Sequence, residues 1–94
     1  MKYFHCLWIH TDVNEPVIIV SEFDDNGFEK RKVEIWRSGR IDWAGENGSS
    51  DDTTLSTYPL ISINQYNDDK QFLAIEITKD EFENHWVLAT SKRF

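Results

Sequence analysis

The Asn26-Gly27 pair constrains the fold most, because it stands between two runs of strand-forming residues. Val17 to Phe23 is a dense β-branched and aromatic run, and Phe28 to Arg37 is a second strand candidate. Asn-Gly supplies the two positive-φ positions that a type I′ hairpin turn requires. We therefore predict that the two strands fold back on each other as an antiparallel hairpin.

The length of this turn also predicts which residues of the two strands face each other. With Asn26-Gly27 as a two-residue loop, Val20 lies opposite Val33, and Glu22 lies opposite Arg31. Both pairs are favourable across strands, since one is apolar and the other joins opposite charges. The pattern thus agrees with the register that the turn predicts.

Further elements follow on either side of the hairpin. Ser38-Gly39 is a second tight turn, and Arg40 to Ala44 is a short strand that completes a meander of three. Lys2 to His10 is an earlier strand with apolar side chains for both faces. Gly45 to Thr54 is small and polar throughout, which predicts a surface loop, and Ser62 to Asp69 is compatible with one or two helical turns.

The C-terminal part predicts a strand followed by a helix. Phe72 to Ile77 alternates in the manner of a strand. Thr78-Lys79-Asp80-Glu81 has the form of a capping box, in which two side chains satisfy the free amides at a helix start. Phe82, Trp86 and Ala89 then fall on one helical face, so this helix is expected to pack through that face.

Together these elements predict an α+β fold, an antiparallel sheet of about five strands with the C-terminal helix packed on one face. The 94 residues are expected to form a single domain, residues 1–94, with 39% apolar residues for its core. No stretch resembles a signal peptide or a membrane span, and a lone cysteine allows no disulfide within the chain. A cytoplasmic location is therefore expected.

The charge of the chain indicates the kind of partner it attracts. Seventeen acidic residues stand against 10 basic ones, for a formal net charge of −7. Such a field repels phosphate backbones and anionic lipids, so nucleic-acid and membrane partners are disfavoured, and it attracts basic proteins. The expected contacts are acidic side chains of two loops: Glu46, Asp51, Asp52, Asp68 and Asp69.

A rival binding surface is basic and aromatic. It comprises Lys30, Lys32, Trp36, Arg37 and Arg40. Basic residues interleaved with aromatic ones are typical of single-strand nucleic-acid binding, and the same surface could hold a small ligand. Glu22, Glu29 and Glu34 are expected cross-strand neighbours, however, and ion pairs within the chain are the favoured use of these cations.

Residues that could carry catalysis or hold a metal are few. His5 and His10 point to opposite faces of a strand, and neither they nor His85 stand at the spacing of a zinc site. Cys6 lies in an apolar strand, as a buried structural cysteine does. We predict no enzymatic activity, no metal and no cofactor.

Several segments of the chain are similar to one known family. They are Glu15-Pro16-Val17, Ser21-Glu22, Arg31-Lys32-Val33-Glu34, Gly39-Arg40, Gly48-Ser49, Ala74-Ile75-Glu76-Ile77, and the helix with Phe82 and Trp86. The chain resembles the small bacterial family catalogued as domain of unknown function 6881. Small acidic proteins of this type resemble immunity proteins, which neutralise toxin domains. The resemblance implies an inhibitor that occludes the active site of a basic toxin, for example a nuclease.

Overall fold

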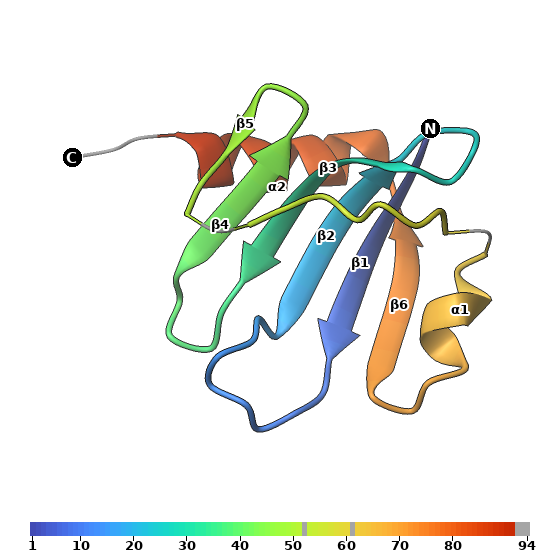
Figure 1. The fold of residues 1–94 in the computed structure, drawn as a ribbon, viewed down its shortest axis with the longest axis horizontal. Coiled ribbons are helices and arrows are strands. Elements are labelled where there is room, and N and C mark those ends of the chain that lie inside the picture. The colour runs from blue at the N-terminus through green and yellow to red at the C-terminus, as the bar shows by residue number, and fades with distance from the viewer. Residues whose placement is uncertain (52, 61, 92–94) are drawn as a thin grey trace.

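The computed structural model describes residues 1–51, 53–60 and 62–91. Within them, six strands form one sheet in the order β5-β4-β3-β2-β1-β6, with every neighbouring pair antiparallel. The elements are β1 (Lys2–Trp8), β2 (Ile18–Phe23), β3 (Glu29–Ile35), β4 (Ile41–Gly45), β5 (Gly48–Ser49), α1 (Asn64–Asn67), β6 (Phe72–Ile77) and α2 (Lys79–Thr90). The predicted α+β class, with an antiparallel sheet and a C-terminal helix, is confirmed (Figure 1).

The turn between β2 and β3 differs from the predicted type I′ turn. Asp24 N donates to Phe28 O, and Gly27 N donates to Asp24 O, each at 2.9 Å. Gly27 has a φ of 86°, whereas Asn26 is not in the positive-φ region. The loop therefore has three residues, a tight turn closed by one left-handed glycine, and the two-residue prediction was wrong.

The predicted register of this hairpin is nevertheless confirmed, with Val20 opposite Val33 and Glu22 opposite Arg31. The pairing shifts between Glu22 and Phe23, because Phe23 lies opposite Glu29. Lys30 is thus the unpaired residue of a β-bulge. The bulge compensates for the three-residue loop, so the register beyond it is the one that a two-residue loop predicts.

The polar stretch after β4 is partly ordered as a strand, so the prediction of a loop over residues 45–54 was wrong there. Gly48 pairs with Gly45, and Ser49 pairs with Ala44. Ser50 extends this hairpin, since its amide donates to Trp43 O and its Oγ accepts from Trp43 N, each at 2.8 Å. Backbone pairing accounts for an element that has no apolar pattern to reveal it.

One face of the sheet is packed by α2, which begins at the predicted capping box. Glu81 N donates to Thr78 Oγ1, and Thr78 N donates to Glu81 Oε1, both at 3.1 Å. Phe82 is fully buried in the core, and Trp86 and Ala89 pack against it, as their spacing predicted. The buried sheet residues of this core are Tyr3, Val20 and Val33.

The opposite face is crossed by an irregular segment, residues 53–60, which Figure 1 shows passing in front of the strands while α2 lies behind them. Leu60 N donates to Gly27 O, and Ser56 N donates to Glu29 Oε1, each at 2.8 Å.

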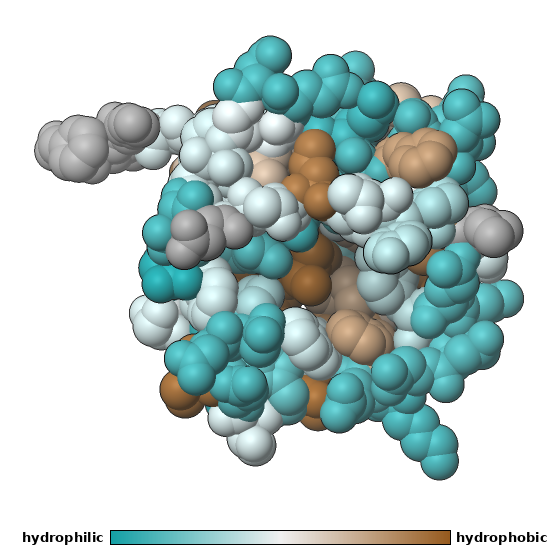
Figure 2. All heavy atoms as spheres, in the orientation of Figure 1, coloured by the Kyte–Doolittle hydropathy of each residue, from teal (hydrophilic) through white to brown (hydrophobic). Residues whose placement is uncertain are grey.

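The short helix α1, within the predicted helical stretch, lies beside β6, where the side-chain amide of Asn67 bonds both the backbone N–H and the carbonyl of Ala74. Figure 2 shows mostly hydrophilic side chains on the face that the irregular segment crosses, with apolar ones toward its centre.

Candidate interaction surfaces

Helix α2 covers only part of its sheet face. The helix packs across β1, β2, β3 and β4, behind the end of the sheet at which β1 begins (Figure 1). Toward the other end of the same face, the strand register aligns five aliphatic side chains, here called the aliphatic row: Leu73, Leu7, Ile18, Ile35 and Ile41. These large aliphatic side chains form one partly exposed apolar line across five strands.

Three residues of the aliphatic row are exposed, including Leu7 at 38%, and the other two are half-buried. Leu73 is 59% exposed and Ile41 is 39% exposed, while Ile18 and Ile35 partly pack against the core. Ile75, beside Leu73 on β6, is 61% exposed. A monomer of this size gains nothing from leaving such side chains in water, so the row is a candidate contact surface.

A histidine pair lies where α2 meets this uncovered surface. The rings of His5 and His85 are 6.0 Å apart, centre to centre. Burial, and then the neighbouring His5, lower the pKa of His85, while Glu81 opposes that shift. His85 is therefore neutral at pH 7.

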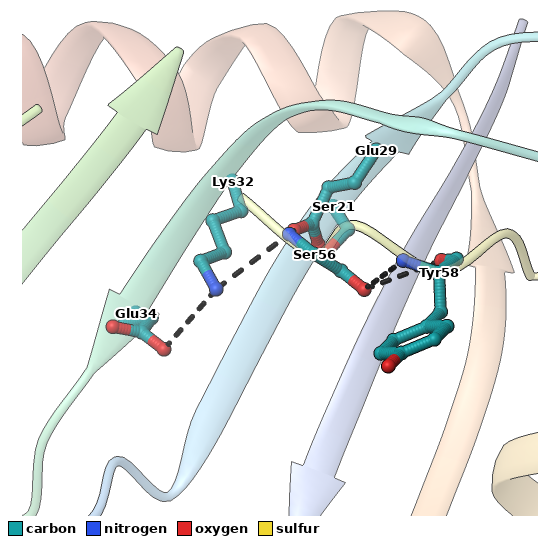
Figure 3. A network of polar contacts seen from close by, with 6 residues as sticks. All are labelled: Ser21, Glu29, Lys32, Glu34, Ser56 and Tyr58. Carbon is teal, nitrogen blue, oxygen red and sulfur yellow. Dashed lines mark hydrogen bonds and ion pairs between the residues drawn. The ribbon is translucent and has the colours of Figure 1, made fainter. Parts of the chain in front are cut away.

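The opposite face carries a polar cluster beneath the crossing segment (Figure 3). The buried carboxylate of Glu29 accepts from Ser21 Oγ and from Ser56 N, each at 2.8 Å. Lys32 Nζ lies 3.8 Å from Glu29 and 3.7 Å from Glu34. These contacts fasten the irregular segment to β2 and β3.

Three residues of the predicted basic and aromatic surface meet beside this cluster. Lys32, Trp36 and Arg40 line one hollow of about 360 Å³, and Arg37 lines the next one with Trp36 and Arg40. The Arg40 guanidinium lies 4.1 Å from the centre of the Trp36 ring and pairs with Asp42 at 3.1 Å. The hollow therefore already contains an ion pair, between Arg40 and Asp42.

Lys30 lies elsewhere, because the bulge directs it toward Glu46, with which it pairs at 2.8 Å. It lines a hollow formed by Arg31, Trp43 and Trp86 on the α2 side. The expected internal pairing of the cations is confirmed for Lys30, Arg31, Lys32 and Arg40. Arg37 instead donates to the carbonyl of His10 at 2.7 Å.

The acidic residues predicted to bind a partner lie near both edges of the sheet, some beside β5 and some beside β6. Glu46 stands in the β4–β5 hairpin, and Asp51 follows β5 and lines the hollow of Lys32. Asp68 and Asp69 follow α1, beside the edge strand β6 at the opposite side of the sheet. Asp52 lies outside the described residues. The two loops therefore present separate acidic surfaces.

The groups considered for chemistry have structural surroundings. Burial raises the pKa of the Cys6 thiol to about 11, which keeps it protonated at neutral pH. His10 Nε2 donates to the carbonyl of Pro16 at 2.7 Å. Among the described residues, no three His, Cys, Asp or Glu side chains gather as a metal site needs. The helices within the described ranges are too short or too polar to cross a bilayer.

Sequence reasoning missed the aliphatic row, although a signal for it was present. The strand of Leu7 and the strand of Leu73 both carry apolar residues for two faces, whereas a single helix can cover only part of one face. The strands carry more apolar side chains than the C-terminal helix can cover, and a comparison of the two would have revealed an uncovered apolar surface. The positions of Leu73 and Leu7 in one row still required the register between β1 and β6.

Comparison with known proteins gives one match. The model of a protein family described as Domain of unknown function (DUF6881) matches residues 2–91. No curated protein and no solved structure matches the chain.

Proposed function

We propose that this chain, which belongs to the family described as Domain of unknown function (DUF6881), is a small acidic binding protein that neutralises a basic protein partner. The proposed partner is a toxin domain, for example a nuclease, and the chain would act in the cytoplasm as its immunity protein. It would work by occluding the active site, without a cofactor or metal and without catalysis of its own.

The observation that carries this proposal is the use of charge within the chain. Lys30, Arg31, Lys32 and Arg40 each contact a carboxylate of the same chain, which cancels most of the basic patch. Exposed carboxylates without an ion pair among the described residues remain at Asp51, Asp68 and Asp69, among others. The external field is therefore acidic, and it would speed the encounter with a basic protein.

A nuclease suits this field for a physical reason. An enzyme that binds a phosphate backbone presents lysines and arginines around its active site, and those cations attract any surface that offers negative charge. An acidic inhibitor can therefore compete for the surface that the nucleic acid uses. Occlusion of this kind needs no group on the inhibitor to react.

A second candidate function is favoured by one specific observation. Lys32, Trp36 and Arg40 meet around a single hollow, with Arg37 next to it, as a nucleic-acid or small-ligand binding module would require. The same hollow also receives Asp51, Glu34 and Asp42, which weakens its attraction for phosphate. We therefore rank this function second.

Co-expression tests the leading proposal. The protein encoded next to this chain in its native genome is expressed in a host cell, alone and together with the chain, and growth is measured. The proposal expects growth to be lost without the chain and restored with it. The purified chain should also inhibit the purified protein at a one-to-one ratio. A host that dies in both cases, or a chain that binds single-stranded RNA tightly at physiological salt, would contradict the proposal.

A further inference from the structure

We infer that the aliphatic row of Leu73, Leu7, Ile18, Ile35 and Ile41 is the surface on which the partner docks, and that the partner presents an apolar centre with a basic rim. This inference rests on the proposed function and adds to it the surface and the chemistry of contact. The sequence analysis expected acidic contact residues only, and it did not single out any of the five residues of the row.

The row is placed where several connections meet. Leu7 is the next-to-last residue of β1, Ile18 begins β2, Ile35 ends β3, Ile41 begins β4, and Leu73 is the second residue of β6. The β1–β2 loop, the β3–β4 turn and the α1–β6 turn therefore border the row at that end of the sheet, as Figure 1 shows.

These connections carry more acid than base. Asp12 stands in the β1–β2 loop, and Asp68 and Asp69 in the α1–β6 turn, all three exposed, while Glu15 of the same loop as Asp12 lines the hollow on the opposite face. Asp12, Asp68 and Asp69 have no ion pair among the residues that the structure describes. Of the cations in these connections, Arg40 is paired with Asp42, so only Arg37 and Lys70 oppose them.

An apolar centre within a charged rim is the usual anatomy of a protein interface. The row supplies contact area that is already uncovered, and the acidic rim requires cations opposite it. A second copy of this chain is disfavoured as the occupant, because two chains of net charge −7 repel and would set acidic rim against acidic rim. Charge complementarity therefore selects a basic protein as the occupant.

Site-specific photo-crosslinking in the native cell tests the location. A photoreactive phenylalanine replaces Leu73 or Ile41 in the row, Val87 on the outer side of α2, or Tyr58 on the opposite face. We expect a basic protein to be crosslinked from Leu73 and Ile41 and not from Tyr58. A basic protein crosslinked from Tyr58 alone would overturn the row but leave the proposed function standing. Crosslinks between two copies at Leu73 would also overturn it, and no basic protein from any position would end both proposals.

Paired substitutions then measure the contribution of the row to binding of the crosslinked protein. Leu73→Glu and Val87→Glu add the same charge at sites of similar exposure, 59% and 57%. Val87 lies one turn beyond Glu83 on α2, on the side of the helix turned from the row. We expect Leu73→Glu to raise Kd at least about tenfold and Val87→Glu to change it by less than about twofold. Equal effects would overturn the inference. If Leu73→Glu lowers the melting temperature, Leu73→Thr replaces it, since threonine suits a strand.

Discussion

The two faces of the sheet are packed by different means. On the α2 face, the ring of Phe82 lies 5.4 Å from that of Tyr3, and Trp86 stacks beside it at 6.3 Å. On the other face, an irregular segment is held by hydrogen bonds to Glu29 and to the Gly27 carbonyl. The α2 face is thus closed by a helix that packs through aromatic rings. The other face is closed by the hydrogen bonds of an irregular segment together with its own aromatic contacts, Phe4 with Phe23 at 5.7 Å and Trp8 with Phe72 at 5.5 Å.

This difference shows which parts of the fold are available for binding. Aromatic packing under α2 is dense but short, because the helix spans only residues Lys79–Thr90, and the aliphatic row beyond it stays uncovered. On the opposite face, Phe4 and Phe23 are buried, and the crossing segment adds hydrogen bonds that contribute less per contact than buried rings. The α2 face is therefore the one that leaves a row of aliphatic side chains partly in water.

Truncation of the Phe82 side chain should have the largest effect on the free energy of unfolding. Phe82→Ala should lower the free energy of unfolding by about 3–5 kcal/mol, because the side chain is fully buried against Tyr3. Tyr58→Ala on the opposite face should change it by less than about 0.5 kcal/mol, since Tyr58 is 82% exposed. Urea unfolding measures both values. A loss below about 1 kcal/mol for Phe82→Ala would break the comparison.

The next largest expected effect is a difference in how much the ion clusters of the two faces contribute to the free energy of unfolding. Arg31 donates to Glu22 at 2.7 and 2.8 Å, reaches Glu83 at 2.8 Å and lies over the Phe82 ring. Arg31→Met should cost about 3 kcal/mol, because it leaves the buried Glu22 without its partner. Lys32→Met should cost about 1 kcal/mol, since its contacts exceed 3.5 Å.

The double variant Arg31→Met with Glu22→Gln supplies the control for this difference. Removal of the uncompensated carboxylate should recover part of the stability that Arg31→Met loses. Thermal unfolding of the single and double variants at pH 7 would report the recovery. A double variant that loses as much stability as the two single variants together would show that Arg31→Met acts through the lost stacking on Phe82 rather than through the unpaired charge of Glu22.

Two glycines test how firmly the crossing segment is attached. Gly27 and Gly39 both have left-handed φ values, 86° and 94°, at equivalent places in their turns. A Cβ at Gly27 would overlap the carbonyl oxygen of Leu60, whereas a Cβ at Gly39 meets open space. Gly39→Ala should therefore cost about 1 kcal/mol, from backbone strain alone, and Gly27→Ala about 2–3 kcal/mol. Equal losses would mean that Leu60 moves away at little cost.

The smallest expected effect is the dependence of stability on pH. Hydrogen bonds from Arg31 hold the pKa of Glu22 below its ordinary value of 4.5. A carboxyl with a lowered pKa stabilises the fold above its ordinary pKa, and this stabilisation is lost as the pH falls through the pKa of the folded state. Unfolding free energy should therefore decline below about pH 4.5, and less steeply in Arg31→Met. Parallel profiles for the two proteins would assign the decline to other carboxyls.

Much of the fold could be predicted because its signals are local. The capping box at Thr78, the spacing of Phe82 and Trp86, and the strand over residues 72–77 each follow from neighbouring residues. The turn at Gly27 was located correctly but mistyped, since Asp24 Oδ1 accepts from Asn26 N and Phe28 N and favours a three-residue loop. β5 escaped prediction, because only its backbone pairing distinguishes it from a loop.

The candidate surfaces were harder to predict, because they depend on contacts between distant parts of the chain. Ion pairing of the cations followed from the hairpin register, as for Arg31 and Glu22. The separation of Glu46 from Asp69 requires the order of strands in the sheet, which places β6 beside β1 and far from β5. The aliphatic row likewise needs the β1–β6 pairing and the short reach of α2.

The rates of binding to the partner protein test the central claim most directly, namely that the acidic rim guides association and the aliphatic row holds the complex. Asp68→Asn with Asp69→Asn should slow association several-fold at low salt and little at high salt, with dissociation unchanged. Leu73→Thr should accelerate dissociation about tenfold and leave association unchanged. Asp25→Asn, in the β2–β3 turn at the end of the sheet away from the row, is the control and should alter neither rate strongly. Association that is insensitive both to salt and to the two aspartates, with dissociation unaffected by Leu73→Thr, would contradict the account.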